Sequence, residues 1–368
     1  MAATPDVIVI GAGVIGCAVA YELARRGTSV RVLETRAIGA GATQASAGVL
    51  APRVEVHEPG PLLDLTERGL SHYDRFVEMV SQDSGLKVEF RRCGTLEVAS
   101  DDAGAARLLA RSAAGAEWLS RERLAVVEPL LSGTCPGGLL IADHGYVGAA
   151  ALTEALAWAA VRHGAQIDAH RRITKVDAGR DAVQVIAEDG SRSSAARVVV
   201  AAGSWSGRVG LDEAAARSVR PVRGQLLRLA WPGPAPGHVI WGERCYVVPW
   251  QDGTVLVGAT VEDVGFDERT TAAGVRDLLD AVCELLPEAW TAAFVDARSG
   301  LRPATTDGLP ILGPSGASPN VIYATGHYRN GVLLAPITAI LLADLIIDNK
   351  LDPALRDFSP KRGALQIR

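Results

Sequence analysis

The chain opens with a pattern of apolar and polar positions that predicts a strand, a helix and a strand in succession. Residues 7–10 are four consecutive β-branched apolar residues, which favour a strand buried on both faces of a parallel sheet. Apolar residues then recur at helical spacing over residues 13–26, and Gly27 follows where a helix would end. Residues 29–33 predict a second strand that ends at Glu34. This order predicts a βαβ unit with a right-handed crossover.

The rest of the chain has an α/β pattern that is interrupted by β-rich stretches. Residues 36–61 are rich in Gly, Ala and Pro and predict an irregular segment with a short helix inside it. From Pro221 the pattern changes to short strands separated by Pro and Gly turns, which predicts an antiparallel sheet. Because α/β patterns occur at the beginning, middle and end, we expect one domain assembled from separated segments and a second, β-rich domain.

The other helices are expected at residues 62–82, 103–123, 151–163 and 272–286 and from about Gly331. The other strands are expected within residues 86–100, near Gln166, as a meander at 173–177, 183–187 and 197–201, and at 225–229, 246–249, 254–257 and 321–324.

Charge and cysteine content limit the classes of partner. The formal net charge is −5 and no long run of Lys or Arg occurs, so we expect no nucleic acid partner. The five cysteines form no Cys-x-x-Cys pair, which favours reduced thiols in a cytoplasm over a disulfide framework or a metal site. Residues 332–347 are apolar but fall short of the about 20 residues of a membrane span. A buried helix without stable membrane insertion is expected there, with peripheral membrane contact as the alternative.

The first turn carries a dinucleotide-binding motif. Residues 11–16 read Gly-Ala-Gly-Val-Ile-Gly, which is G-x-G-x-x-G between a predicted strand and a predicted helix. Gly11 allows the tight turn, Gly13 lets the backbone approach a pyrophosphate, and Gly16 lets helix and strand pack closely. The helix N-terminus offers free N–H groups to phosphates. Glu34 follows 23 residues after Gly11, where its carboxylate can accept hydrogen bonds from ribose hydroxyls.

The segment after Glu34 favours FAD over NAD. Residues 39–48 are mostly Gly, Ala, Ser and Thr, which suits a backbone that wraps around the second part of a long dinucleotide. In an NAD-dependent dehydrogenase the chain would be expected to return to the sheet here. A surface loop is the alternative interpretation of this segment.

With these residues in view, nearly the whole chain resembles the glycine oxidase, D-amino acid oxidase and sarcosine oxidase group of flavoenzymes. The shared motifs occur in order at residues 9–16, at the strand end Glu34, and at 41–48, 199–206, 221–225, 245–249, 300–310 and 326–336. The last four are most similar to bacterial glycine oxidases of the thiamine pathway. The resemblance implies a doubly wound, Rossmann-like FAD-binding domain plus an α+β substrate domain with a large antiparallel sheet.

The resemblance also implies domain boundaries and an assembly. The FAD-binding domain is expected to comprise residues 1–85, 145–218 and 300–368, and the substrate-binding domain residues 86–144 and 219–299. A homo-oligomer, by resemblance a homotetramer, is expected.

The FAD is expected to be non-covalent. Sarcosine oxidases hold FAD through a cysteine near the segment that matches Leu301, and this chain has no Cys between residues 284 and 368. A second helix N-terminus near Gly331 would stabilise the anionic end of reduced flavin. Besides the three glycines of the first turn, the expected FAD contacts are Val14, Ile15, Glu34, Thr35, Ala42, Thr43, Ala47, Gly48, Val49, Val176, His327, Tyr328, Arg329, Asn330, Gly331, Val332 and Leu333.

The substrate is expected to bind at Arg302, Tyr246, Arg329 and Val49. A guanidinium can clamp a carboxylate through two parallel hydrogen bonds, so Arg302 is the expected anchor, with a surface ion pair as the alternative. Tyr246 could donate its hydroxyl to the same carboxylate or pack without a ligand. Arg329 would lie near the flavin or in a structural ion pair. The family often has Met where Val49 stands, so a larger pocket that admits sarcosine, N-ethylglycine, D-alanine or D-proline is expected.

The resemblance implies oxidative deamination of glycine, other small amino acids or N-alkylglycines by hydride transfer to flavin N5. O₂ would be reduced to H₂O₂, and dehydroglycine would serve thiamine thiazole synthesis. The transfer needs a neutral amine but no side-chain base at the α-carbon, so no catalytic acid or base is nominated. The alternatives are an FAD-dependent D-amino acid or imino acid dehydrogenase with a quinone or carrier as acceptor, an NAD-dependent dehydrogenase, and a non-catalytic dinucleotide-binding protein.

Overall fold

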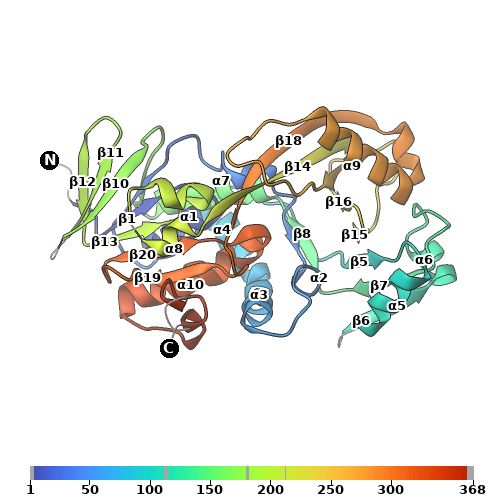
Figure 1. Cartoon of the computed structure of the whole chain (residues 1–368), viewed down its shortest axis with the longest axis horizontal. Coiled ribbons are helices and arrows are strands. Elements are labelled where there is room, and N and C mark those ends of the chain that lie inside the picture. Colours follow the sequence, from blue (N-terminus) through green and yellow to red (C-terminus); the bar gives the residue numbers. More distant parts are fainter. Residues whose placement is uncertain (1–3, 112–114, 180–181, 212, 363–368) are drawn as a thin grey trace.

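The structure is a computed structural model that describes residues 4–111, 115–179, 182–211 and 213–362. Two large sheets lie at opposite ends of the molecule, as Figure 1 shows. One is a six-stranded, mainly parallel sheet and the other is an eight-stranded, mainly antiparallel sheet. The expected combination of a doubly wound domain and a domain with a large antiparallel sheet is therefore confirmed.

The six-stranded sheet has the order β19-β20-β13-β1-β2-β9. Its strands are β1 (Val7–Ile10), β2 (Val30–Leu33), β9 (Gln166–Asp168), β13 (Arg197–Val200), β19 (Ile311–Pro314) and β20 (Val321–Thr325). All neighbours pair in parallel except β19, which runs antiparallel to β20 at the edge. The predicted βαβ unit is β1, α1 (Val14–Arg25) and β2.

Both faces of this sheet are covered, which explains the unbroken β-branched run of β1. Val7 and Val9 pack against a helical layer, whereas Ile8 and Ile10 pack against a three-stranded sheet on the opposite face. The helical layer consists of α1, α4 (Tyr73–Ser84), α7 (Ala149–Arg162) and α10 (Gly331–Asp348). The three-stranded sheet consists of β10 (Ile173–Ala178), β11 (Val183–Ala187) and β12 (Arg192–Ala195).

The meander expected at residues 173–177, 183–187 and 197–201 is correct for its first two strands and wrong for its third. In the structure the third strand of this small sheet is β12. Residues 197–200 form β13, which pairs in parallel with β1 in the centre of the six-stranded sheet. All three Val residues of β13 are buried, whereas β12 keeps one exposed and two half-buried positions. A strand buried on both faces belongs in a parallel sheet, which is what the Val run favours.

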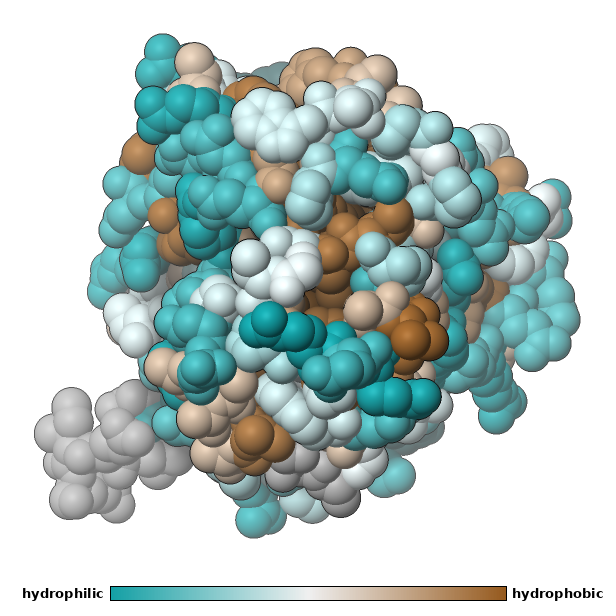
Figure 2. Space-filling model, turned by 90° about the vertical axis from the view of Figure 1, so that its right-hand side faces the viewer, coloured by the Kyte–Doolittle hydropathy of each residue, from teal (hydrophilic) through white to brown (hydrophobic). Residues whose placement is uncertain are grey.

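The eight-stranded sheet has the order β18-β14-β17-β16-β15-β5-β7-β6. Its strands are β5 (Thr95–Val98), β6 (Ala116–Ser120), β7 (Gly137–Ile141), β14 (Arg220–Ala230), β15 (Val239–Trp241), β16 (Tyr246–Pro249), β17 (Thr254–Gly258) and β18 (Ala293–Ala304). Helix α9 (Ala272–Leu285) packs on one face through Leu278 and Val282. Figure 2 views the molecule from this end and shows apolar residues inside a hollow that polar residues surround.

The helix expected over residues 103–123 is wrong in its second half. Helix α5 (Asp102–Ala110) is followed by strand β6, and α6 (Arg121–Val127) begins after it. Residues 116–120 pair with β7 at the sheet edge, and Leu119 is buried there. Pairing with a distant strand overrides the local pattern here.

A short three-stranded sheet joins the two ends of the molecule, with β8 (Gly145–Val147) between β3 (Val49–Leu50) and β4 (Phe90–Arg91). The helix expected over residues 62–82 is two helices, α3 (Pro61–Ser71) and α4. The irregular segment before them contains the short helix α2 (Pro52–Glu55) and the 3₁₀ helix η1 (Ala42–Ala45).

Helix α10 is the long apolar element of the C-terminal region. Within the described residues, Tyr328–Asp348 is long and apolar enough to cross a membrane, but 72% of its most apolar window is buried inside the protein. It packs against α1 and α3, and its interior positions join the core of the parallel sheet. These contacts are those of the core helix that the sequence predicts.

Candidate active site

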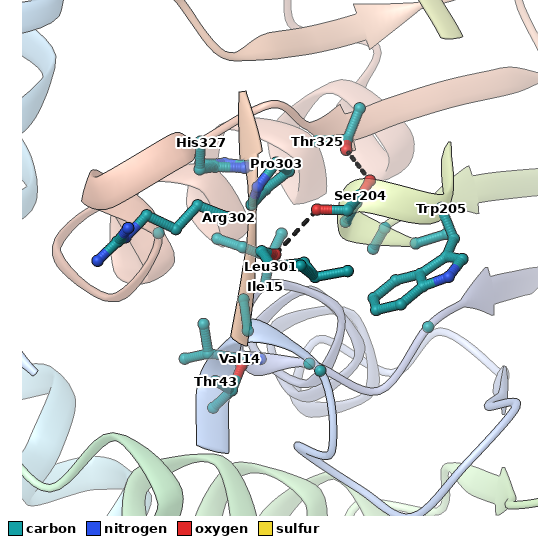
Figure 3. A pocket seen from close by; sticks show the side chains of 18 of the residues that line it. Val14, Ile15, Thr43, Ser204, Trp205, Leu301, Arg302, Pro303, Thr325 and His327 are labelled. Atoms are coloured by element: carbon teal, nitrogen blue, oxygen red, sulfur yellow. Dashed lines mark hydrogen bonds between the residues drawn. The ribbon is translucent and has the colours of Figure 1, made fainter. Parts of the chain in front are cut away.

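A cavity of about 460 Å³ lies where the parallel strands end. Ile10, Leu33, Ala201 and Thr325 line it from the carboxyl ends of β1, β2, β13 and β20. Ligands of open α/β sheets bind at this edge. Figure 3 shows Arg302 and Trp205 on opposite sides of the cavity, with Leu301 between them.

The glycine-rich turn is built as its sequence predicts. Gly11 has φ +105°, and a Cβ atom there would lie 2.5 Å from the carbonyl oxygen of Ala201. A Cβ atom on Gly16 would lie 1.9 Å from the carbonyl oxygen of Gly11, so only glycine lets α1 pack this closely. Gly13 precedes the first residue of α1 and lines the cavity, where its backbone is accessible to a phosphate.

Glu34 is held at the end of β2. One carboxylate oxygen accepts a hydrogen bond from the backbone N–H of Ala12 at 2.7 Å, and the other accepts one from the N–H of Arg36 at 2.7 Å. These contacts fix the carboxylate beside the cavity, which it lines. Its remaining acceptor positions suit the hydroxyls of a ribose.

The small-residue segment wraps around the cavity. The hydroxyl of Thr43 accepts a hydrogen bond from the N–H of Val14 at 3.1 Å, which ties the segment to the start of α1. A Cβ atom on Gly48 would lie 1.8 Å from the carbonyl oxygen of Val147, so this glycine permits the contact between β3 and β8. The segment lines the cavity through Gly41, Ala42, Thr43, Ala45, Ser46, Ala47, Gly48 and Val49.

The loop between β20 and α10 forms the opposite wall. His327 is buried, and its Nε2 lies 3.2 Å from the hydroxyl oxygen of Thr338. Burial lowers the pKa of His327 to about 3, so the imidazole is neutral at physiological pH. Ser204 donates a hydrogen bond to the carbonyl oxygen of Leu301 at 2.8 Å, which holds the loop after β13 against β18.

Arg302 lies at the end of the cavity away from Trp205. Its Nη1 donates to the carbonyl oxygen of Thr260 at 2.9 Å, and among the described residues no carboxylate pairs with it. Tyr246 lines the same end, and burial raises the pKa of its hydroxyl while the neighbouring Arg302 opposes the rise. A guanidinium without an ion-pair partner among the described residues, beside a neutral hydroxyl, suits a carboxylate.

Arg329 is paired with an acid that the sequence did not indicate. Its Nε lies 2.7 Å from Oε2 of Glu55, and both side chains line the cavity. Burial raises the pKa of the Glu55 carboxyl, and the charge of Arg329 opposes this rise. Cζ of Arg329 also lies 5.5 Å from the ring centre of Trp241, which stacks on Tyr246 at 4.9 Å.

The cavity therefore collects most of the predicted site residues. The predicted residues among its lining are Gly11, Gly13, Val14, Ile15, Glu34, Thr35, Ala42, Thr43, Ala47, Gly48, Val49, Tyr246, Arg302, His327, Tyr328, Arg329, Gly331 and Val332. Gly16, Val176, Asn330 and Leu333 are not among the lining residues. Val176 lies in strand β10, and the residue of this strand that lines the cavity is Ile173.

Sequence reasoning missed a cationic and aromatic group at the far end of the cavity. Cζ of Arg36 lies 4.5 Å from the ring centre of Trp205, and Cζ of Arg208 lies 3.5 Å from that of Phe266. The one signal for this group in the sequence was that Trp205 lies in the motif at residues 199–206, which carries the family resemblance. Two guanidinium groups beside a glycine-rich turn suit a diphosphate.

Comparisons with known proteins agree with this geometry. Residues 6–345 match the family model DAO, FAD dependent oxidoreductase. The chain is 36% identical to the bifunctional protein ThiO/ThiG of Synechocystis sp., over 98% of this chain and 54% of that protein. It therefore spans about half the length of these fused relatives. It is 32% identical to the glycine oxidase of Geobacillus kaustophilus, over 93% of this chain and 92% of that protein.

Among solved structures, too, the chain is similar to a glycine oxidase. The crystal structure of glycine oxidase from Geobacillus kaustophilus superimposes with a TM-score of 0.92 and covers 98% of this chain and 99% of its own. The iminodiacetate oxidase from Chelativorans sp. is 27% identical and superimposes with a TM-score of 0.87, over 96% of this chain and 98% of its own.

Proposed function

The chain belongs to the FAD dependent oxidoreductase family, and on that premise we propose that it oxidises glycine and other small amino acids or N-alkylglycines. One observation carries the proposal: Arg302 has no carboxylate partner among the described residues and shares its end of the cavity with Tyr246. The other end fits a dinucleotide. The site therefore offers a carboxylate anchor at a fixed position relative to the cofactor.

The residues present fit FAD. The turn at residues 11–16 would hold the pyrophosphate, Glu34 the ribose, and the loop from His327 the ring system. Bound FAD supplies a hydride acceptor, at N5, for the hydrogen on the substrate's α-carbon. No cysteine lies among the residues that line the cavity, which supports non-covalent binding.

The chain's own contribution is binding and orientation. The substrate carboxylate would accept two hydrogen bonds from Arg302 and one from Tyr246, which fixes the direction of the α-carbon. Trp241 stacks on Tyr246, and Glu55 pairs with Arg329, so these contacts hold the side chains at this end of the cavity in place. His327 is neutral and engaged with Thr338, so it offers no charge to the reaction, and no side-chain acid or base is assigned.

We further propose that O₂ reoxidises the flavin to give H₂O₂ and that the imine of glycine serves the thiazole of thiamine. The relatives named ThiO/ThiG, whose length this chain half covers, support that role. A cytoplasmic homo-oligomer, with a tetramer as the specific form, completes the proposal.

The test begins with a visible spectrum of the purified protein. Absorbance near 450 nm that acid precipitation releases into solution is expected, and a colourless protein after incubation with excess FAD would refute the proposal. A peroxide-coupled screen should then show turnover with glycine and sarcosine. Dye reduction without H₂O₂ would instead identify a dehydrogenase, and size-exclusion chromatography with light scattering would test the tetramer.

A further inference from the structure

Glu55 is a nearly buried carboxylate in the cavity for which the proposed reaction has no role. It is the last residue of α2, and its side chain is 12% exposed. It lines the same cavity as Arg302 and Tyr246. A buried carboxylate costs free energy unless it is paired, so its position needs an explanation.

The carboxylate of Glu55 is paired with Arg329: its Oε2 lies 2.7 Å from Nε of Arg329, whose side chain is 28% exposed. Arg329 belongs to the 3₁₀ helix η4 (Tyr328–Asn330), immediately before α10. The pair therefore joins two walls of the cavity that come from distant parts of the chain.

The pair decides the charge of this end of the cavity. Two guanidinium groups, those of Arg302 and Arg329, line it. The carboxylate of Glu55 forms an ion pair with Arg329, also acts electrostatically on Arg302, and offsets one of the two positive charges. Tyr246 and Trp241 carry no charge there, and His57, which also acts on Glu55 electrostatically, is exposed. The remaining charged residues of the lining, Arg36 among them, lie toward the dinucleotide end. One unpaired positive charge is left for the substrate.

We propose that Glu55 sets the charge class of the substrate: by holding Arg329 in an ion pair, it restricts the site to amino acids and N-alkylglycines with a single anionic group. A substrate with a second carboxylate or a phosphonate would need the Arg329 guanidinium, whose charge Glu55 offsets. Glu55 is thus a specificity residue that acts through Arg329 and takes no part in the chemistry. This inference rests on the proposed function and adds the charge class to it.

The test uses two unreactive ligands that differ by one carboxylate. Methoxyacetate matches the shape of sarcosine, and diglycolate matches it with a second carboxylate added. Their dissociation constants are measured by titration calorimetry and by the change in flavin absorbance, in the wild type and in Glu55→Gln. The amide keeps the size of the side chain but no longer neutralises Arg329. We expect the ratio of the two dissociation constants to shift toward diglycolate by about tenfold in the variant, as for one partly buried charge contact.

Matched variants separate charge from packing. Glu55→Asp keeps the charge and should keep the wild-type ratio. The double variant Glu55→Gln/Arg329→Gln removes both charges and should also return toward that ratio. If Glu55→Gln does not yield folded, FAD-loaded protein, Glu55→Ala frees Arg329 equally and must show the same shift. An unchanged ratio in the variants without the Glu55 carboxylate would overturn the inference.

The experiments distinguish a failure of the proposed function from a failure of the charge-class inference. If the wild type bound no FAD, or oxidised neither glycine nor sarcosine, the proposed function itself would fall. If the wild type oxidised sarcosine and bound methoxyacetate but the Glu55 variants kept the same preference, the charge-class inference alone would be wrong. Turnover of iminodiacetate relative to sarcosine should follow the binding ratio in each variant.

Discussion

Gly224 makes room for the guanidinium of Arg302: a Cβ atom on Gly224 would lie 2.2 Å from Nη2 of Arg302. The two residues lie on the adjacent strands β14 and β18, where Val222 is the direct partner of Arg302. A residue two positions further along β14 points to the same face, so its side chain would occupy the space of the guanidinium. The proposed carboxylate anchor thus depends on the absence of a side chain at Gly224 in the neighbouring strand.

Replacing Gly224 with Ala is therefore expected to displace Arg302. We expect KM for glycine to rise at least about tenfold, because the bidentate carboxylate contact is lost, while FAD content stays at the wild-type level. Steady-state kinetics and the ratio of absorbance at 450 nm to that at 280 nm measure the two quantities. Gly233, whose Cβ would meet nothing within 4 Å, provides the control substitution. An unaltered KM in Gly224→Ala would contradict the assignment of Arg302.

Glu34 should determine FAD affinity. Replacing it with Gln removes the negative charge of the carboxylate, which would accept hydrogen bonds from ribose hydroxyls. We therefore expect the dissociation constant of FAD to rise by about tenfold or more. Quenching of flavin fluorescence on binding to apoprotein measures it. Asp168 at the end of the adjacent strand β9 pairs with Arg31 and does not line the cavity, so Asp168→Asn is the matched control. Equal effects of the two substitutions would argue against a ribose contact.

The cofactor should leave the protein on denaturation. Cys17, the cysteine nearest the glycine-rich turn, donates to the carbonyl oxygen of Ala12, and burial raises its pKa to about 12. It is therefore a protonated thiol and a poor nucleophile. We expect acid precipitation to give a colourless pellet and all flavin in the supernatant, where absorbance quantifies it. Yellow colour in the washed pellet would show a covalent link.

Acid should destabilise the fold in part through His144. This side chain is buried, and burial lowers its pKa from 6.5 to about 3. Between these values the unfolded chain binds a proton that the folded chain does not, so stability falls as the pH drops from 6.5 toward 3. One such group contributes a slope of about 1.4 kcal/mol per pH unit in this window. His327 contributes with the same sign.

The measurement is the free energy of urea unfolding at several pH values between 6.5 and 4. The variant His144→Phe removes the titrating group, and its slope against pH should be smaller than that of the wild type whatever its absolute stability. Identical slopes in the wild type and in His144→Phe would contradict the role of His144.

Local signals in the sequence predicted the nucleotide end of the site, because its geometry is local. The turn at residues 11–16 needs glycine for contacts within one βαβ unit, and Glu34 ends the second strand of that unit. The long-range features could not be predicted in this way. Glu55 lies in a segment with no periodic pattern and gains its role from Arg329, and β6 is a strand because β7 lies beside it.

The order of strands in the six-stranded sheet has a consequence for biosynthesis. Strand β1 is made before its neighbour β13 and the next strand, β20, which come from residues 197–200 and 321–325. In the nascent chain β1 therefore lacks its partner on one side until residues 197–200 have emerged. The cavity is complete only when residues 327–332 have also been made, because they line it, so we expect a fragment that ends before them not to retain flavin, although it carries the whole glycine-rich motif.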